Sequence, residues 1–275
     1  MRSINDTYKL FVVDIDGTLL NRNGTISAED KEALARVKDS GIKVSLSTGR
    51  VMQASLRIIK QLSLSGYHMF FDGALVGSLE GGGEVYLKPI SGELVRQIVE
   101  FAHRSEMTFD LYSVTHYFVE RETWATDIRR EFFGLQPTVV DFVGLWQKER
   151  IIKGTLVVCS AEERAKADSF YLRFKDMLSF SWTKTPAYPK VDFINVLAPH
   201  VSKGVALEAL ASFLGIPLKE VVAVGDGAND FSLLSKAGLA IAMGNAPDEL
   251  KAIADYITLD VDHNGVATAI NKFLL

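Results

Sequence analysis

The chain has 275 residues, of which 48% are hydrophobic and 23% charged, and its formal net charge is −4. This composition predicts a globular protein of one large or two unequal domains. The mild negative charge argues against nucleic acid or an anionic membrane as the main partner. The polar first ten residues do not resemble a signal peptide, and no apolar run approaches the roughly 20 residues of a membrane span. We therefore expect a soluble, cytoplasmic protein with no nucleic-acid and no membrane partner.

Apolar runs bounded by Gly, Asp or Asn alternate with helix-period segments towards both ends of the chain. The expected elements are, in order, strand 10–13, helix 27–38 capped by Ser27, strand 42–47, helix 51–62, strand 69–71, strand 221–224, helix 231–237, strand 239–243 and helix 247–254. Strands separated by helices predict right-handed crossovers and a parallel sheet with helices on both faces. The predicted fold class is therefore α/β with a Rossmann-like core.

The middle of the chain has a different pattern. Residues 76–87 contain three consecutive glycines between two short β-like runs, which predicts a hairpin. From there to about residue 190 the chain has helices and strands of its own, and the segment 184–190 is expected to be the return linker. We therefore predict an α/β cap domain at 88–190, inserted between two parts of a core domain at 1–87 and 191–275.

The single cysteine, Cys159, ends the apolar run 155–159 within this insert. One cysteine cannot form an internal disulfide, and one cysteine is compatible with a reducing compartment. Its apolar neighbours predict a buried, inert thiol.

Acids, hydroxyls and glycines follow each apolar strand of the predicted core. They are Asp14 and Asp16, then Ser47-Thr48-Gly49-Arg50, then Asp72-Gly73-Ala74, and finally Gly225-Asp226-Gly227-Ala228-Asn229-Asp230. In open parallel α/β sheets, ligands bind beyond the carboxyl ends of the strands. We therefore expect these residues to meet at one edge of the core sheet.

Several carboxylates at one edge cannot all ionise cheaply without a cation, because like charges raise each other's pKa. Oxygen ligands with no His or Cys nearby favour Mg²⁺ over zinc or copper. A calcium-binding EF-hand is excluded, since loops starting at Asp14 or Asp226 lack the required Gly at the sixth position and Glu at the twelfth. The predicted cofactor is therefore Mg²⁺.

A Mg²⁺ site of this kind usually leaves room for a substrate phosphate. Thr48 and the amides around Gly49, at the start of a predicted helix, form a suitable anion-binding corner. Lys203, at the start of another predicted helix, is a candidate for the balancing positive charge. The sequence has neither a Walker A pattern nor a Rossmann glycine fingerprint, so neither of those nucleotide-binding modes is expected.

Four short motifs occur in a fixed order: Asp14-Ile-Asp-Gly-Thr18, Ser47-Thr-Gly-Arg50, Ser202-Lys-Gly204 and Gly225-Asp-Gly-Ala-Asn-Asp230. With them the chain resembles the haloacid-dehalogenase (HAD) superfamily of phosphohydrolases, and within it the Cof-type sugar phosphatases. The long insert lies between the second and third motifs, unlike the cap of phosphoserine phosphatases, which lies between the first and second. P-type ATPases have Lys where this chain has Asp16, and they need membrane spans.

The resemblance implies a mechanism and a set of site residues. Asp14 is the nucleophile that forms an aspartyl-phosphate, and Asp16 is the general acid and base. The metal ligands are Asp14, the backbone carbonyl of Asp16 and Asp226, with Asp230 bound through water or orienting the others. The residues expected to hold the phosphoryl group are Thr48, Gly49, Lys203 and Asn229.

Two departures from the Cof-type pattern are visible, and both leave the substrate open. Asp72 stands where these proteins often have Asn, and His200 stands where a Gly often precedes the lysine motif. The predicted function is hydrolysis of a small phosphorylated metabolite such as a sugar phosphate. A phosphotransferase or mutase of the phosphomannomutase type and a non-catalytic phosphometabolite-binding protein remain alternatives. The insert is expected to act as a lid, and the chain to be a monomer or weak homodimer.

Overall fold

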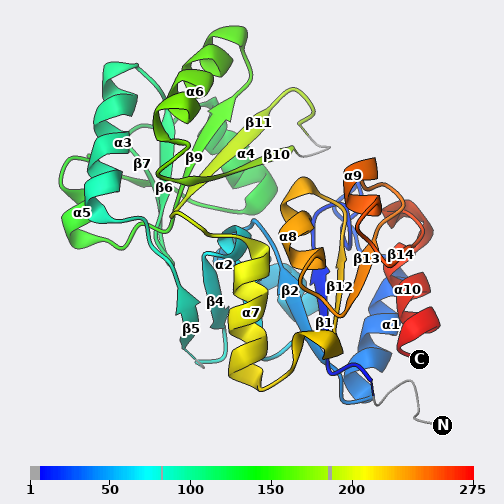
Figure 1. Ribbon diagram of the computed structural model, residues 1–275. Helices are drawn as coiled ribbons and strands as arrows, with labels where there is room; N and C mark the ends of the chain where they lie inside the picture. Colours follow the sequence, from blue (N-terminus) through cyan, green and yellow to red (C-terminus); the bar gives the residue numbers. More distant parts are fainter. Residues whose placement is uncertain (1–6, 82, 185–187) are drawn as a thin grey trace. The chain divides into compact units, whose positions relative to one another are not determined.

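The computed structural model describes residues 7–81, 83–184 and 188–275 (Figure 1). The chain forms two compact units. We call Met1–Gly49, Arg57–Leu87 and Ser202–Leu275 the core unit, and Arg50–Leu56 with Lys88–Val201 the insert unit. Each unit has its own sheet and its own helices, and the predicted α/β class is confirmed.

The core unit contains an eight-stranded sheet with the order β14-β13-β12-β1-β2-β3-β4-β5. Its strands are β1 (Leu10–Asp14), β2 (Lys43–Ser47), β3 (Tyr67–Phe70), β4 (Leu75–Ser78), β5 (Glu84–Leu87), β12 (Val221–Gly225), β13 (Leu239–Ala242) and β14 (Tyr256–Ile257). The pairs from β14 to β3 are parallel, whereas β4 and β5 add an antiparallel edge. The sheet is therefore parallel where the sequence predicts it, with the expected hairpin as its edge.

The hairpin runs from β4 to β5, and its glycine turn is described in part. Gly81 and Gly83 both have positive φ angles, at 81° and 78°, which glycine adopts without strain. Gly82, the middle glycine of the predicted turn, lies outside the described residues.

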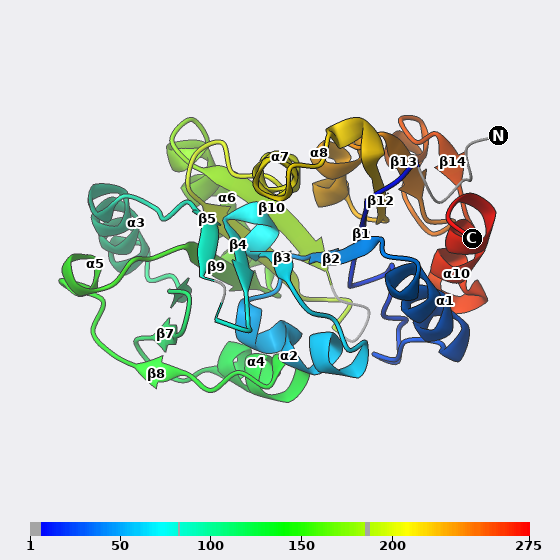
Figure 2. The ribbon, with the colours of Figure 1, turned by 90° about the horizontal axis from the view of Figure 1, so that it is seen from below.

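Helices cover both faces of the core sheet. They are α1 (Ala28–Asp39), the second half of α2 (Met52–Gln61), α7 (Lys203–Leu214), α8 (Phe231–Leu234), α9 (Asp248–Lys251) and α10 (Gly265–Phe273), with short 3₁₀ turns η2 (Phe71–Gly73), η3 (Leu218–Glu220), η4 (Ala228–Asp230) and η5 (Val261–His263). Figure 2 shows α7 and α8 on one side of the sheet and α1 and α10 on the other. Parallel strands buried on both faces form continuous apolar runs, as β1 and β12 do.

Capping residues start the helices that carry the predicted motifs. Ser27 accepts a hydrogen bond from the Asp30 amide at 3.0 Å at the start of α1. Ser202 does the same for the Val205 amide at 3.2 Å at the start of α7. A hydroxyl in this position satisfies an amide that has no partner within the helix. The cap of α7 therefore fixes the position of Lys203, the first residue of that helix.

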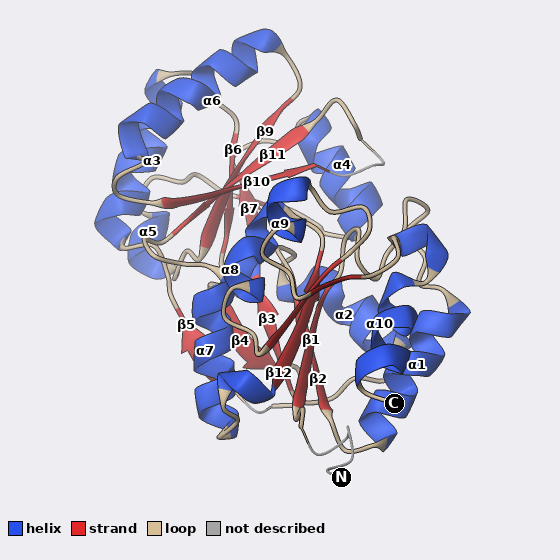
Figure 3. Cartoon of the chain, turned by 45° about the vertical axis from the view of Figure 1, so that its right-hand side comes forward, coloured by secondary structure: helices blue, strands red, loops and turns tan. Residues whose placement is uncertain are grey.

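The insert unit contains a six-stranded sheet with the order β10-β11-β9-β6-β7-β8. Several of its strands are drawn in red in Figure 3. Its elements are α3 (Gly92–Arg104), β6 (Phe109–Tyr112), β7 (Tyr117–Val119), α4 (Trp124–Phe133), β8 (Thr138–Val139), α5 (Leu145–Lys148), β9 (Lys153–Val158), α6 (Ala161–Phe174), β10 (Ser179–Lys184) and β11 (Asp192–Leu197). All neighbouring strands are antiparallel except β7 and β8. Ser160 and Glu163 form a capping box at the start of α6.

The return to the core lies later in the chain than the predicted boundary at 190. β11 pairs with β10 and β9 in the insert sheet, and the core unit resumes at Ser202. The segment 184–190, predicted as the return linker, therefore joins two strands of one sheet; its residues 185–187 lie outside the described residues. A short buried strand does not reveal from its sequence which sheet it joins, so the apolar run at 192–197 was misassigned to the core.

Cys159 is exposed, so the prediction of a buried thiol is wrong. β9 ends one residue earlier, at Val158, and Cys159 lies in the turn before α6. The amide of Cys159 donates to Glu163 Oε2 at 2.8 Å, which belongs to the cap of that helix. The apolar run in the sequence thus extends one residue beyond the strand.

A buried histidine side chain supplements the pairing between β2 and β3. The Leu46 amide donates to Nδ1 of His68 at 3.2 Å, and the His68 side chain is only 1% exposed. Burial lowers the pKa of His68 to about 4, because the charged imidazolium loses its hydration. The neutral ring with an unprotonated Nδ1 is the form that accepts this hydrogen bond.

We predict that His68 makes the core unit acid-sensitive. Its pKa is about 6.5 when unfolded and about 4 when folded, so the unfolded state binds the proton first as the pH falls. His68 should thus cost about 3 kcal/mol of stability between about pH 6.5 and about pH 4. Urea unfolding of His68→Asn, which keeps an acceptor near Leu46, should show a pH dependence smaller by this amount. An unchanged pH dependence in that variant would contradict the prediction.

Candidate active site

Asp14 is the last residue of β1, the strand that lies between β12 and β2. Its side chain is only 8% exposed, whereas Asp16, two residues further on, is exposed. Between them Ile15 is fully buried, which anchors the segment in the core. The two acids of the first motif therefore occupy different environments, one inside the protein and one at its surface.

The Lys203 ammonium lies between two carboxylates. Nζ donates to Oδ1 of Asp14 at 2.7 Å and to Oδ1 of Asp230 at 2.5 Å. The lysine side chain is fully buried. Burial opposes the charged form, but the neighbouring Asp14 and Asp230 carboxylates outweigh it and raise the pKa of Lys203. Lys203 is thus a fixed, permanently charged cation at the carboxyl end of β1.

Asp230 is held from two directions. Its Oδ1 faces Lys203, and its Oδ2 accepts hydrogen bonds from the amides of Asp226 and Gly227 at 3.0 and 2.9 Å. The side chain is completely buried. Both carboxylate oxygens therefore have protein partners, which suits Asp230 to orienting the loop after β12 more than to direct contact with a ligand.

Asp226, the first residue after β12, is fixed by two residues from elsewhere in the core unit. Thr18 Oγ1 donates to Asp226 Oδ1 at 2.7 Å, and Asn245 Nδ2 donates to Oδ2 at 3.2 Å. Asn245 Nδ2 also donates to the carbonyl of Gly17 at 2.9 Å. The loops after β1, β12 and β13 are thereby joined around one carboxylate.

Gly17 must be glycine for this arrangement. Its φ is 87°, and a Cβ atom at this position would collide with the Asp226 carboxylate. A side chain would therefore both strain the backbone and displace Asp226. The glycine of the first motif lets the chain turn close to the acid of the fourth.

The three buried or half-buried acids form a cluster suited to a cation. Among the described residues, oxygen atoms of Asp14, Asp226 and Asp230 lie within 4.8 Å of one another. Burial raises the pKa of Asp14 well above its usual value. The Lys203 ammonium lowers this pKa, whereas the Asp230 and Asp226 carboxylates raise it further. Burial and the nearby Asp230 raise the pKa of Asp226 to about 7. A hard divalent cation fits these three acids, because all of their ligand atoms are oxygens and Lys203 alone does not balance their negative charge.

The predicted phosphate-binding residues are connected to the acid cluster through Asp72. The Asp72 amide donates to the carbonyl of Thr48 at 3.0 Å, and its carboxylate lies against Gly49. Asn229 Nδ2 donates to Asp72 Oδ1 at 2.9 Å, and Asn229 directly precedes Asp230. The structure therefore brings together the predicted segments around Asp14, Thr48, Lys203 and Asp226 within the core unit.

Two residues that contact Asp226 were missed as site residues. Thr18 belongs to the first motif, but it is not among the predicted site residues. Asn245 follows β13, the next strand of the parallel sheet, and the rule that ligands bind beyond the carboxyl ends of strands applies there too. The same rule applied to β13 identifies Asn245.

His200, the second departure from the Cof-type pattern, has a φ of 66°. Glycine adopts this left-handed conformation freely, which explains why a glycine suits the position. In this chain a non-glycine residue takes the same backbone conformation, at the end of the insert unit.

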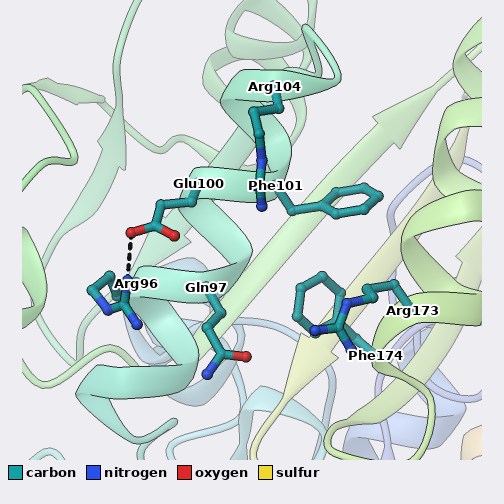
Figure 4. Close-up of a pocket in the computed structure, with 7 residues that line it drawn as sticks. All are labelled: Arg96, Gln97, Glu100, Phe101, Arg104, Arg173 and Phe174. Carbon is teal, nitrogen blue, oxygen red and sulfur yellow. Dashed lines mark hydrogen bonds and ion pairs between the residues drawn. The ribbon is translucent and has the colours of Figure 1, made fainter.

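The insert unit has a cavity of its own, of about 260 Å³, between α3 and α6 (Figure 4). Three arginines, Arg96, Arg104 and Arg173, line it together with Gln97, Glu100, Phe101 and Phe174. Arg96 Nη1 donates to Glu100 Oε1 at 2.6 Å, the contact drawn in Figure 4. The cavity holds none of the predicted site residues and has no grouping of carboxylates, so the candidate active site is the cluster in the core unit.

Comparisons with known proteins agree with this assignment. The sequence pattern of haloacid dehalogenase-like hydrolases matches residues 11–270. The phosphatase YwpJ of Bacillus subtilis is 29% identical, over 97% of this chain and 100% of that protein. The 5-amino-6-(5-phospho-D-ribitylamino)uracil phosphatase YcsE of the same organism is 28% identical, over 97% and 96%. The solved HAD subclass IIB sugar phosphatase BT4131 is 25% identical with a TM-score of 0.79, over 96% and 98%.

The helices of the described ranges bear on the expectation about membranes. None of them combines the length and the apolar character that crossing a bilayer requires. The family assignment rests on the sequence pattern and the relatives given above. The chain is therefore a phosphatase of the haloacid dehalogenase-like hydrolase family, of the Cof type that its motifs indicated.

Proposed function

We propose that the chain hydrolyses a small phosphomonoester, with sugar phosphates as the first candidates, through an aspartyl-phosphate on Asp14. The observation that carries the proposal is the buried Asp14 carboxylate, whose Oδ1 is held at 2.7 Å by the Lys203 ammonium. A carboxylate fixed in this way is positioned to attack phosphorus, with displacement of the alcohol. The sugar phosphatase among the structural relatives supports the substrate class.

Asp16 is the proton carrier in this proposal. Its side chain is exposed, in contrast to Asp14, and lies two residues further along the same turn. It gives a proton to the departing alkoxide when the P–O bond breaks. It then takes a proton from the water that attacks the aspartyl-phosphate, which releases inorganic phosphate and restores Asp14.

Mg²⁺ is the cation that we propose for the acid cluster. Asp14, Asp226 and the backbone carbonyl of Asp16 would hold it, while Asp230 orients the loop through its contacts with two amides. When bound, the ion supplies positive charge that favours ionised carboxylates and offsets the charge of the phosphoryl group. Thr48, the amide of Gly49, Lys203 and Asn229 would hold the phosphoryl oxygens.

The first prediction concerns the nucleophile. Asp14→Asn keeps an oxygen for the Lys203 contact but cannot form the acyl phosphate, so kcat should fall by roughly 10³-fold or more. The assay is release of inorganic phosphate from p-nitrophenyl phosphate and from a panel of sugar phosphates, with and without Mg²⁺. Full activity of this variant would overturn the mechanism.

The second prediction separates the two acids. p-Nitrophenolate leaves without a proton, so Asp16→Asn should still form the intermediate but hydrolyse it slowly. Rapid mixing should show a burst of p-nitrophenolate equal to the enzyme concentration, followed by slow turnover. Asp14→Asn should show no burst and is the matched control. Absence of a burst in Asp16→Asn, with unchanged turnover, would exclude Asp16 as the base.

The third prediction concerns the metal. Millimolar MgCl₂ should raise the melting temperature of chelator-treated protein, because binding to the folded state adds stability of about 2.7 kcal/mol at a hundredfold excess over Kd. Asp14→Asn should melt no lower than wild type without metal, because it removes one crowded acid, and should respond less to Mg²⁺. The exposed Asp248→Asn is the control and should keep the full response. An equal response in all three proteins would place the ion elsewhere.

A further inference from the structure

The turn after β3 has an unusual backbone. Phe71, Asp72 and Gly73 have φ angles of 54°, 54° and 98°. Residues other than glycine rarely adopt this left-handed region, although Asp and Asn tolerate it better than most. Two consecutive non-glycine residues in this conformation persist only where the surrounding contacts hold them.

The contacts that hold the turn come from the predicted phosphate-binding segments. On one side the Asp72 amide donates to the Thr48 carbonyl at 3.0 Å, and the Asp72 carboxylate lies so close to Gly49 that a Cβ there would be 2.8 Å from Oδ1. On another side Gly73 lies against the backbone of Ser202 and Lys203, where a Cβ would collide. One strained turn thus touches the second and the third motif.

The fourth motif is attached by a side-chain hydrogen bond. Asn229 Nδ2 donates to Asp72 Oδ1 at 2.9 Å, and Asp72 is only 3% exposed. A carboxylate offers acceptors, so the amide of Asn229 must present its nitrogen to Asp72. An asparagine at position 72 could pair with Asn229 in either orientation, and the orientation of Asn229 would then be less well fixed.

The charge of Asp72 also acts on the lysine of the third motif. Burial opposes the charged form of Lys203, and Asp72 contributes with Asp14 and Asp230 to the raised pKa of this lysine. The turn therefore meets Lys203 through backbone packing at Gly73 and through the charge of Asp72.

We propose that Asp72 is a positioning residue of the phosphatase reaction. It fixes the orientation of the Asn229 amide and connects that residue to the Thr48–Gly49 segment. The phosphate-binding segments at Thr48–Gly49, Lys203 and Asn229 thereby keep fixed positions relative to one another. Asp72 acts through Asn229 and the backbone, without touching the substrate. The inference rests on the proposed function, in which these segments hold the phosphoryl group.

Asp72→Gly is the sharpest test, because glycine adopts a φ of 54° without strain while the carboxylate is lost. Its melting temperature should stay close to that of wild type. Its kcat/KM for p-nitrophenyl phosphate should fall roughly ten- to hundredfold, and its calorimetric affinity for inorganic phosphate in Mg²⁺ buffer should fall too. Asp72→Asn, which keeps an acceptor and tolerates the backbone, should lose less.

The route through Asn229 is tested by a double-mutant cycle. If Asp72 acts by holding Asn229, the double variant Asp72→Gly/Asn229→Ala should lose no more kcat/KM than the worse single variant. Ser63→Gly is the matched control, since Ser63 is an exposed non-glycine residue with a φ of 48° outside the site. It should keep wild-type activity and phosphate affinity.

Three results would overturn the inference. The first is wild-type kcat/KM and phosphate affinity in Asp72→Gly. The second is a loss of kcat/KM in the double variant that equals the product of the two single losses. The third is an equal loss of kcat/KM in Asp72→Gly and Asp72→Asn that is accompanied by a fall in melting temperature. Phosphate affinity needs no turnover, so it tests Asp72 even if an active Asp14→Asn variant refutes the aspartyl-phosphate mechanism.

Discussion

The Lys203 ammonium is the charge on which the acid cluster of the core unit depends. It faces Asp14 from β1 and Asp230 from the loop after β12, at 2.7 and 2.5 Å, and all three side chains are buried. Loss of Lys203 would leave two buried carboxylates without this compensating charge, which is strongly destabilising. The same contacts set the position of α7 against the carboxyl ends of two neighbouring parallel strands.

The cluster is organised for chemistry more than for the stability of the metal-free protein. Burial raises the pKa values of Asp14 and Asp226, so their ionised forms are disfavoured in the folded state. The left-handed turn at Phe71 and Asp72 adds backbone strain of order 1–3 kcal/mol per residue. Strain and crowded charge in one place are typical of functional sites, where the rest of the fold supplies the compensating stability.

Much of the core and its site could be predicted from the sequence, because both follow from one regularity. Buried parallel strands are continuous apolar runs, and the residues after them meet at one edge; Asp14, Thr48 and Asp226 were found in this way. The sequence of a strand does not show which other strands pair with it, so the predicted domain boundary put β11 in the core unit, whereas it belongs to the insert unit. The hydrogen bond from Asn229 to Asp72 spans 157 residues, and sequence could identify the acid at 72 but not what it holds.

The position of β1 at the centre of the sheet has a consequence for how the chain is made. One edge of β1 pairs with β2 nearby, but the other pairs with β12, which begins about 200 residues later, at Val221. At ordinary rates of synthesis, of about 5–20 residues per second, β12 is made roughly 10–40 s after β1. The edge of β1 that pairs with β12 is unpaired during this time. An apolar strand with a bare edge is a template for pairing with other chains. The insert therefore lengthens the time for which this edge of β1 is unpaired in each new molecule.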